Sequence, residues 1–178
     1  MSAAHHNLSI RLAAIDDLPR IVEIYNQSVA GKQATADLQP VSVADRQAWF
    51  DAHTGNRPLV VAQTRSETSS ETSLGEIIGW GSLSDLYARP AYHISTEISI
   101  YVADEAKGQG VGKALVNYLL KIAPSYGVQQ VVALIFAHNT PSLAMFDRLG
   151  FEPWGKFKQV CDMKGFIADV VILGKSVD

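Results

Sequence analysis

The stretch KGQGVGK, from Lys107 to Lys113, places three glycines and two lysines between a strand-like run and a helix-like run. Lys107, Gly110 and Gly112 satisfy the pattern basic-x-x-G-x-G of a pyrophosphate-binding loop. The first turn of a helix carries unpaired backbone N–H groups and a partial positive charge, so anions bind there readily. Glycines let the backbone approach phosphates closely, and the lysines add positive charge. A glycine-rich turn with ordinary surface lysines is the alternative interpretation.

Two other phosphate-binding loops fit this stretch less well. A P-loop requires G-x-x-x-x-G-K-[ST], but Lys107 stands where its first glycine belongs and Ala114 replaces the metal-binding Ser or Thr. A Rossmann fingerprint requires G-x-G-x-x-G near the start of a βαβ unit. Gly108, Gly110 and Gly112 instead give G-x-G-x-G in the middle of the chain.

Hydrophobic periodicity predicts the elements that hold this loop in place. Strands are expected at residues 8–13, 59–64, 77–83, 96–102, 130–137, 157–161 and 166–173. Helices are expected from a cap at Asp16 or Asp17 to Gly31, at 42–53 with Ser42 as its N-cap, after the glycine stretch, and at 141–149 with Thr140 as its N-cap. This order of elements predicts one mixed α/β domain.

The composition limits the class of protein. The 178 residues carry a net charge of −3 and no long basic run, which disfavours nucleic-acid binding. Cys161 is the one cysteine, no Cys/His cluster has zinc spacing, and no secretory signal or bilayer-length apolar stretch is present. We therefore expect a cytoplasmic protein without a metal or a membrane partner. Residues 1–7 are expected to form a disordered tail, and residues 65–76 a mobile hairpin loop.

Two longer segments carry a resemblance to a known family. EISIYVADEAKGQGVGKAL and FAHNTPSLAMFDRLGFEP resemble motifs A and B of the GNAT N-acetyltransferase superfamily. IVEIYNQSV, ADRQAWFDAH and AYHISTEISIYV are similar to the branch that acetylates phosphinothricin and methionine sulfoximine. The resemblance runs from about Ile10 to Leu173, except for the insertion Arg65–Glu76.

The resemblance implies a single GNAT-like domain over residues 1–178, with a mixed sheet of about seven strands and about four helices. It implies that acetyl-CoA lies between two splayed parallel strands, at 96–102 and 130–137, and that the chain forms a homodimer. The freed strand edge would bind the pantetheine arm, much as a sheet edge binds a peptide. The implied cofactor-binding residues are Ile100, Tyr101, Val102, Lys107, Gly108, Gln109, Gly110, Val111, Gly112, Lys113 and Asn139.

The resemblance also implies the catalytic groups. Glu97 matches the catalytic glutamate of the branch and would remove the proton of an amine that attacks acetyl-CoA directly. The backbone N–H of Val102 would stabilise the thioester oxygen. Phe146 stands where many superfamily members carry a tyrosine that reprotonates the leaving thiolate. Tyr101 and Tyr118 are alternative donors, and CoA leaving as the thiolate is another solution.

The loop ahead of Glu97 matches the acceptor site of the branch. Tyr87, Ala88 and Arg89 would line this site together with Glu97, and Arg89 would hold a carboxylate through two parallel hydrogen bonds. We expect the acceptor to be a small amino acid or analogue. A peptide N-terminus, a polyamine, or a non-catalytic module that senses acyl-CoA remain as alternatives.

Overall fold

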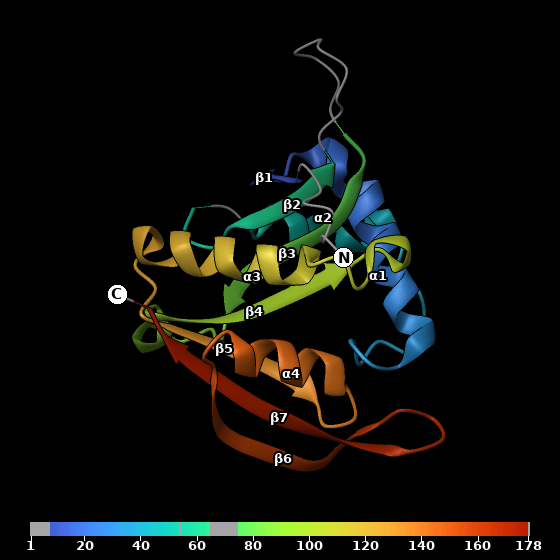
Figure 1. The fold of residues 1–178 in the computed structure, drawn as a ribbon, viewed down its shortest axis with the longest axis vertical. Coiled ribbons are helices and arrows are strands. Elements are labelled where there is room, and N and C mark those ends of the chain that lie inside the picture. Colours follow the sequence, from blue (N-terminus) through green and yellow to red (C-terminus); the bar gives the residue numbers. More distant parts are fainter. Residues whose placement is uncertain (1–7, 54, 65–74, 178) are drawn as a thin grey trace, which may run out of the picture.

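The computed structural model of the protein describes residues 8–53, 55–64 and 75–177. These residues form one sheet of seven strands in the order β1-β2-β3-β4-β5-β7-β6 (Figure 1). The strands are β1 (Leu8–Leu12), β2 (Leu59–Thr64), β3 (Ile77–Asp85), β4 (Ser95–Val102), β5 (Gln130–Phe136), β6 (Glu152–Asp162) and β7 (Ile167–Ser176). The helices are α1 (Leu18–Gly31), α2 (Val43–Asp51), α3 (Val111–Ile122) and α4 (Thr140–Arg148). The predicted α/β fold is confirmed.

The sheet is antiparallel except between β4 and β5, which run parallel. These two strands pair only at their first residues, and the last matched pair is Glu97 with Val132. Beyond that pair β4 continues to Val102 and β5 to Phe136, and the two strands diverge (Figure 1). The expected splay between residues 96–102 and 130–137 is therefore present, and Glu97 lies at its apex.

The two faces of the sheet carry different helices. α1 and α2 cover one face, where Trp80 of β3 packs on Tyr25 of α1 and Trp49 of α2. α3 and α4 lie on the other face (Figure 1). α3 approaches β3 closely at Gly79, where an added Cβ would lie 3.0 Å from Cγ1 of Val111. A glycine is needed there because a side chain would push away the helix that begins at the glycine stretch.

Side-chain caps mark the starts of α2 and α4. Ser42 accepts a hydrogen bond from the backbone N–H of Asp45 at 3.1 Å, as its predicted N-cap role requires. The prediction that Thr140 caps α4 is wrong, because Asn139 takes this position and accepts from the backbone N–H of Ser142 at 3.3 Å. An Asn side chain reaches this N–H readily, and Thr140 becomes the first helical residue.

The C-terminal ribbon is longer than its hydrophobic pattern predicts. β6 covers residues 152–162 rather than 157–161, and almost all of its side chains are exposed. It is an edge strand that is defined by its pairing with β7, and its register shifts between Phe157 and Cys161. Burial alternation therefore could not mark its ends. The predicted tail at 1–7 and most of the predicted loop, residues 65–74, lie outside the described residues.

Candidate active site

Glu97 is a carboxylate at the apex of the splay with an unusual environment. Its side chain is half-buried, and among the described residues it has no hydrogen-bond donor or ion-pair partner. Burial disfavours the charged form and raises the pKa of Glu97 above its ordinary value. A carboxylate with a raised pKa and no partner is suited to accept a proton.

The edge of β4 beyond Glu97 has backbone groups that β5 does not use. The backbone N–H of Ala103 donates to the carbonyl of Ile78 at 2.9 Å, and this contact continues the register in which Val102 faces Gly79. Hydrogen-bonded pairs alternate along an antiparallel ladder. The N–H groups of Ile100 and Val102 therefore point away from β3, toward the splay.

The glycine stretch turns the chain into the first turn of α3. Gly108 and Gly110 have φ angles of +76° and +84°, which favour glycine, and a Cβ added to either would meet no atom within 4 Å. The open side of both residues leaves room for a ligand against the backbone. Gly112 differs, because an added Cβ would lie 3.3 Å from Sδ of Met145. Its missing side chain therefore serves the packing of α3 on α4.

The side chains of the loop are partly engaged with their neighbours. Lys107 forms an ion pair with Asp104, and both side chains are exposed. Nε2 of Gln109 donates to the carbonyl of Glu105 at 2.8 Å. Lys113 is exposed on the first turn of α3. The backbone N–H groups of this turn are thus the fixed donors of the loop, and the lysines add mobile positive charge.

Asn139 is buried and holds the start of α4. Besides capping the helix, it donates from Nδ2 to the carbonyl of Gln33 at 3.0 Å. The amide therefore ties α4 to the segment that follows α1. One Nδ2 hydrogen is left for a further acceptor.

The predicted acceptor residues lie in the connection between β3 and β4, just ahead of Glu97. Tyr87, Ala88 and Arg89 are all exposed, and the ring of Tyr87 packs edge-on against Tyr92 with centroids 5.0 Å apart. The backbone N–H of Arg89 donates to the carbonyl of Tyr87 at 2.8 Å. This turn lies between the end of β3 at Asp85 and the start of β4 at Ser95.

The surroundings of Phe146 and Tyr101 bear on which group could protonate the leaving thiolate. Phe146 is buried against Phe151, with ring centroids 4.8 Å apart, and has no proton to give. The hydroxyl of Tyr101 donates to the carbonyl of Ala34 at 3.2 Å. Burial raises the pKa of Tyr101 strongly, so its hydroxyl is a weak acid.

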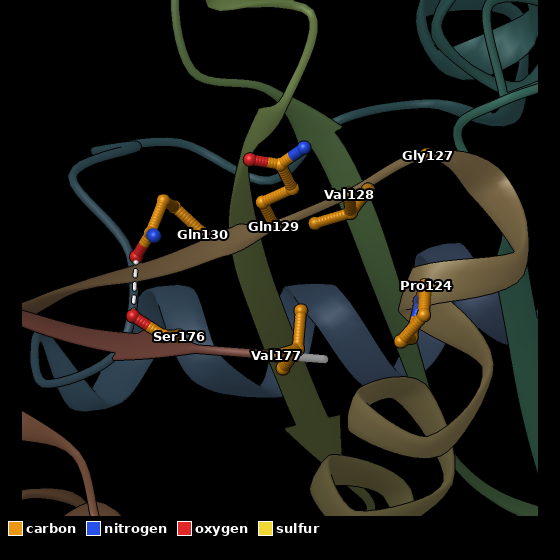
Figure 2. Close-up of a pocket in the computed structure, with 7 residues that line it drawn as sticks. All are labelled: Pro124, Gly127, Val128, Gln129, Gln130, Ser176 and Val177. Atoms are coloured by element: carbon orange, nitrogen blue, oxygen red, sulfur yellow. Dashed lines mark hydrogen bonds between the residues drawn. The ribbon is translucent and has the colours of Figure 1, made fainter.

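A separate hollow lies at the start of β5, away from these groups. Figure 2 shows its lining, which consists of Pro124, Gly127, Val128, Gln129, Gln130, Ser176 and Val177. Ser176 donates from Oγ to Oε1 of Gln130 at 3.0 Å across it. None of the lining side chains is ionisable, so this hollow offers no acid or base for catalysis.

Comparisons with known proteins identify the family of this chain. The profile of the acetyltransferase (GNAT) family matches residues 20–151 of the chain. The chain belongs to the GNAT acetyltransferase family. The chain is 40% identical over 170 residues to YwnH of Bacillus subtilis, a protein named as a phosphinothricin acetyltransferase without an established activity. The match covers 96% of this chain and 99% of YwnH.

Two further relatives carry explicit activities in their names. An L-methionine sulfoximine/L-methionine sulfone acetyltransferase of Pseudomonas aeruginosa is 34% identical over 171 residues, covering 96% of this chain and 95% of the relative. The crystal structure of a GNAT superfamily phosphinothricin acetyltransferase from Sinorhizobium meliloti in complex with acetyl-CoA superposes with a TM-score of 0.86. It is 34% identical and covers 96% of this chain and 89% of that one. This GNAT protein is an acetyl-CoA-dependent N-acetyltransferase.

The site contains groups that sequence reasoning did not select. On the face covered by α1 and α2, His53 contacts Ser84, which is the strand neighbour of Glu97. Trp80 stacks on Tyr101 beside them, with centroids 4.6 Å apart. The segment ADRQAWFDAH, which ends at His53, contributed only to the family resemblance, because nothing in its spacing connects it to Glu97.

Among the described residues, no group of three or more His, Cys, Asp or Glu side chains is arranged to hold a metal ion. Within the same part of the chain, no helix is both long and apolar enough to cross a membrane.

Proposed function

We propose that this GNAT enzyme acetylates the α-amine of a small amino acid or analogue, of the phosphinothricin or methionine sulfoximine kind. The observation that carries the proposal is Glu97, a half-buried carboxylate with no partner among the described residues, at the apex of the splay. The named activities of the relatives support the acceptor class.

Acetyl-CoA supplies the acetyl thioester when it is bound. The N–H groups of Ile100 and Val102 would bind its arm along the freed edge of β4, together with the backbone at Tyr101. Residues 107–113 would hold the pyrophosphate, chiefly through the backbone at Gly108 and Gly110 and the first turn of α3. Asn139 would add a contact through its remaining Nδ2 hydrogen.

Glu97 acts as the general base of a direct transfer. It takes the proton of the acceptor ammonium, either directly or through a water, and the free amine attacks the thioester carbon. The N–H of Val102 donates to the carbonyl oxygen as negative charge develops on it. CoA leaves as the thiolate, because thiols have a reference pKa near ~8.5 and Phe146 cannot donate a proton. The nitrogen gives its second proton to water as the amide forms.

The acceptor is held by the turn between β3 and β4. Arg89 binds its α-carboxylate through the two parallel N–H groups of the guanidinium, so that the α-amine faces Glu97. Tyr87 and Ala88 form the adjoining wall of the site.

We also propose that the protein forms a homodimer and acts in the cytoplasm. The ribbon of β6 and β7 exposes Trp154, Phe157, Val160, Phe166 and Ile167, each at least 42% exposed. Such a cluster of exposed apolar side chains is typical of a surface that is covered by another protein. The cytoplasm is the compartment in which acetyl-CoA meets free amino acids. Light scattering after size exclusion would show a dimer mass, and a monomer at all concentrations would refute this part.

The experiment that tests the proposed function is acetyl-CoA turnover over a panel of acceptors. The panel contains free amino acids, methionine sulfoximine, phosphinothricin, a peptide with a free N-terminus and a polyamine. Turnover with the amino-acid analogues supports the proposal. Turnover only with the peptide or the polyamine refutes the acceptor class, and acetyl-CoA binding without any turnover refutes the enzyme.

A further inference from the structure

Three side chains on one face of the sheet form a row that ends at Glu97. Nε2 of His53, which follows α2, lies 3.0 Å from Oγ of Ser84 on β3. Ser84 is the register partner of Glu97 on β4. Directly opposed residues of antiparallel strands share a face, with Cβ atoms roughly 4.5–5.5 Å apart. The Ser84 hydroxyl thus lies on the face of the sheet that carries Glu97, and among the described residues it is bonded to His53 rather than to Glu97.

The hydrogen bonds of His53 determine the direction of that hydroxyl. Nδ1 of His53 lies 2.8 Å from the carbonyl oxygen of Trp49. A carbonyl oxygen only accepts, so Nδ1 carries the hydrogen, and Nε2 of the neutral ring is an acceptor. Ser84 therefore donates its single hydrogen to Nε2 and presents only lone pairs to Glu97.

This direction favours a proton on Glu97. An ionised carboxylate has no donor, so it gains no hydrogen bond from a hydroxyl whose hydrogen is used elsewhere. A protonated Glu97 can donate to Oγ of Ser84. Because a hydrogen bond to the neutral form of an acid disfavours its ionisation, the arrangement strengthens Glu97 as a base.

We propose that His53 and Ser84 are positioning residues that keep Glu97 basic, with His53 holding the Ser84 hydroxyl in its accepting direction. The inference rests on the proposed role of Glu97 as the general base. The acceptor N–H bond breaks and an O–H bond forms on Glu97, whose hydrogen is then available for a hydrogen bond to Oγ of Ser84. His53 and Ser84 take no part in the C–N bond that forms or the C–S bond that breaks in the acetyl transfer.

Burial favours the neutral form of the His53 ring. Burial is the largest influence and lowers the pKa of His53, against the bond to Trp49 and the charge of Asp85, which raise it. Asp85 is itself paired with Arg57 at 2.6 Å. At low pH the protonated ring would donate from Nε2 to Ser84. The Ser84 hydrogen would then be free to stabilise ionised Glu97, which weakens the base.

Other charged and titratable groups lie on the side of Glu97. Tyr101 follows on the same face of β4, and Tyr25 of α1 packs on it with centroids 5.0 Å apart. Arg46 of α2 lies over the ring of Tyr25 and donates to Asp37 at 3.1 Å. Arg46 also lies over the ring of Trp49, which packs on His53. An effect that reaches Glu97 through Trp49 is the same in the wild-type and Ser84→Ala backgrounds, so comparing His53→Phe in the two backgrounds separates it from the effect through Ser84.

The test is a double-mutant cycle of His53→Phe and Ser84→Ala, read by NMR titration of the Glu97 carboxyl carbon. Phenylalanine keeps a ring against Trp49 and removes the acceptor. In His53→Phe the Ser84 hydroxyl is free to donate to the carboxylate, so the Glu97 midpoint should fall by about one pH unit. The acid limb of kcat/KM should move with it. In the Ser84→Ala background, His53→Phe should produce no further change.

An unchanged Glu97 midpoint in His53→Phe, or an equal fall in both backgrounds, would overturn the proposal. If His53→Phe does not fold, the proposal is tested by the tautomer of His53 in the unmutated protein. The NMR shifts of the ring nitrogens at pH 8 should show the hydrogen on Nδ1. Hydrogen on Nε2 would overturn the proposal. The titration needs no turnover, so a fully active Glu97→Gln would refute Glu97 as the base without affecting this reading of Ser84.

Discussion

Gly110 offers a change that separates folding from cofactor binding. It is the N-cap of α3 with φ of +84°, and a side chain there would enter open space. A left-handed residue other than glycine costs about 1–2 kcal/mol, least for Asn and Asp. Both are also good N-caps, which returns about 1 kcal/mol. Gly110→Asp and Gly110→Asn should therefore unfold within about 1 kcal/mol of wild type.

The two variants should differ sharply with acetyl-CoA, because only Asp places a negative charge where the pyrophosphate binds. At a cofactor concentration of 100 Kd, wild type should gain about 2.7 kcal/mol. For a chain of this size that is a rise in Tm of roughly 5–10 °C in a thermal shift assay. Gly110→Asn should keep most of the rise, and Gly110→Asp should lose it. A full rise in Gly110→Asp would refute the pyrophosphate site.

Three further predictions concern the acceptor, the base and the leaving group. Arg89→Ala should raise the KM of the carboxylate acceptor by a factor equivalent to roughly 1.5–3 kcal/mol while leaving the KM of acetyl-CoA alone, and Arg89→Lys should rescue poorly. Equal wild-type turnover of acid and carboxyl-amidated acceptors would contradict this role. Because burial raises the pKa of Glu97 in the folded protein, wild type loses stability as pH rises above about 4.5, the ordinary value of this group. Glu97→Gln should therefore have the higher Tm at pH 8 but not at pH 4, and a constant difference in Tm would show that Glu97 is not desolvated. Phe146→Tyr should leave kcat at pH 9 unchanged, because most thiols with a pKa near ~8.5 are ionised there; a several-fold rise would show that departure of CoA needs a proton donor.

The sequence predicts the central part of the fold because its signals there are local. β2 occupies the predicted residues 59–64, and α3 begins at Val111, directly after its N-cap Gly110 in the glycine stretch. Alternation marks strands that have one buried face, and caps mark helix ends. β6 fails this test because it is an exposed edge strand without alternation, and its length is set by β7.

The residues of the site also differ in how far the sequence could identify them. Gly110 is selected by the spacing of glycines and lysines, and Glu97 by the family resemblance of the segment that contains both. His53 and Ser84 are 31 residues apart, and their contact depends on how α2 packs on the sheet. The packing role of Gly112 likewise depends on Met145 of α4. Such long-range contacts leave no period or spacing in the sequence.

Turnover of Glu97→Gln from pH 6 to 9 tests the central claim most directly. The acceptor is the best substrate of the panel, and acetyl-CoA binding is measured on the same preparations. Glu152→Gln, which removes an exposed carboxylate on β6, is the matched control. Glu97→Gln should bind acetyl-CoA normally and turn over about 10²–10⁴-fold more slowly than both wild type and the control. Turnover close to wild type across this range would show that Glu97 is not the base.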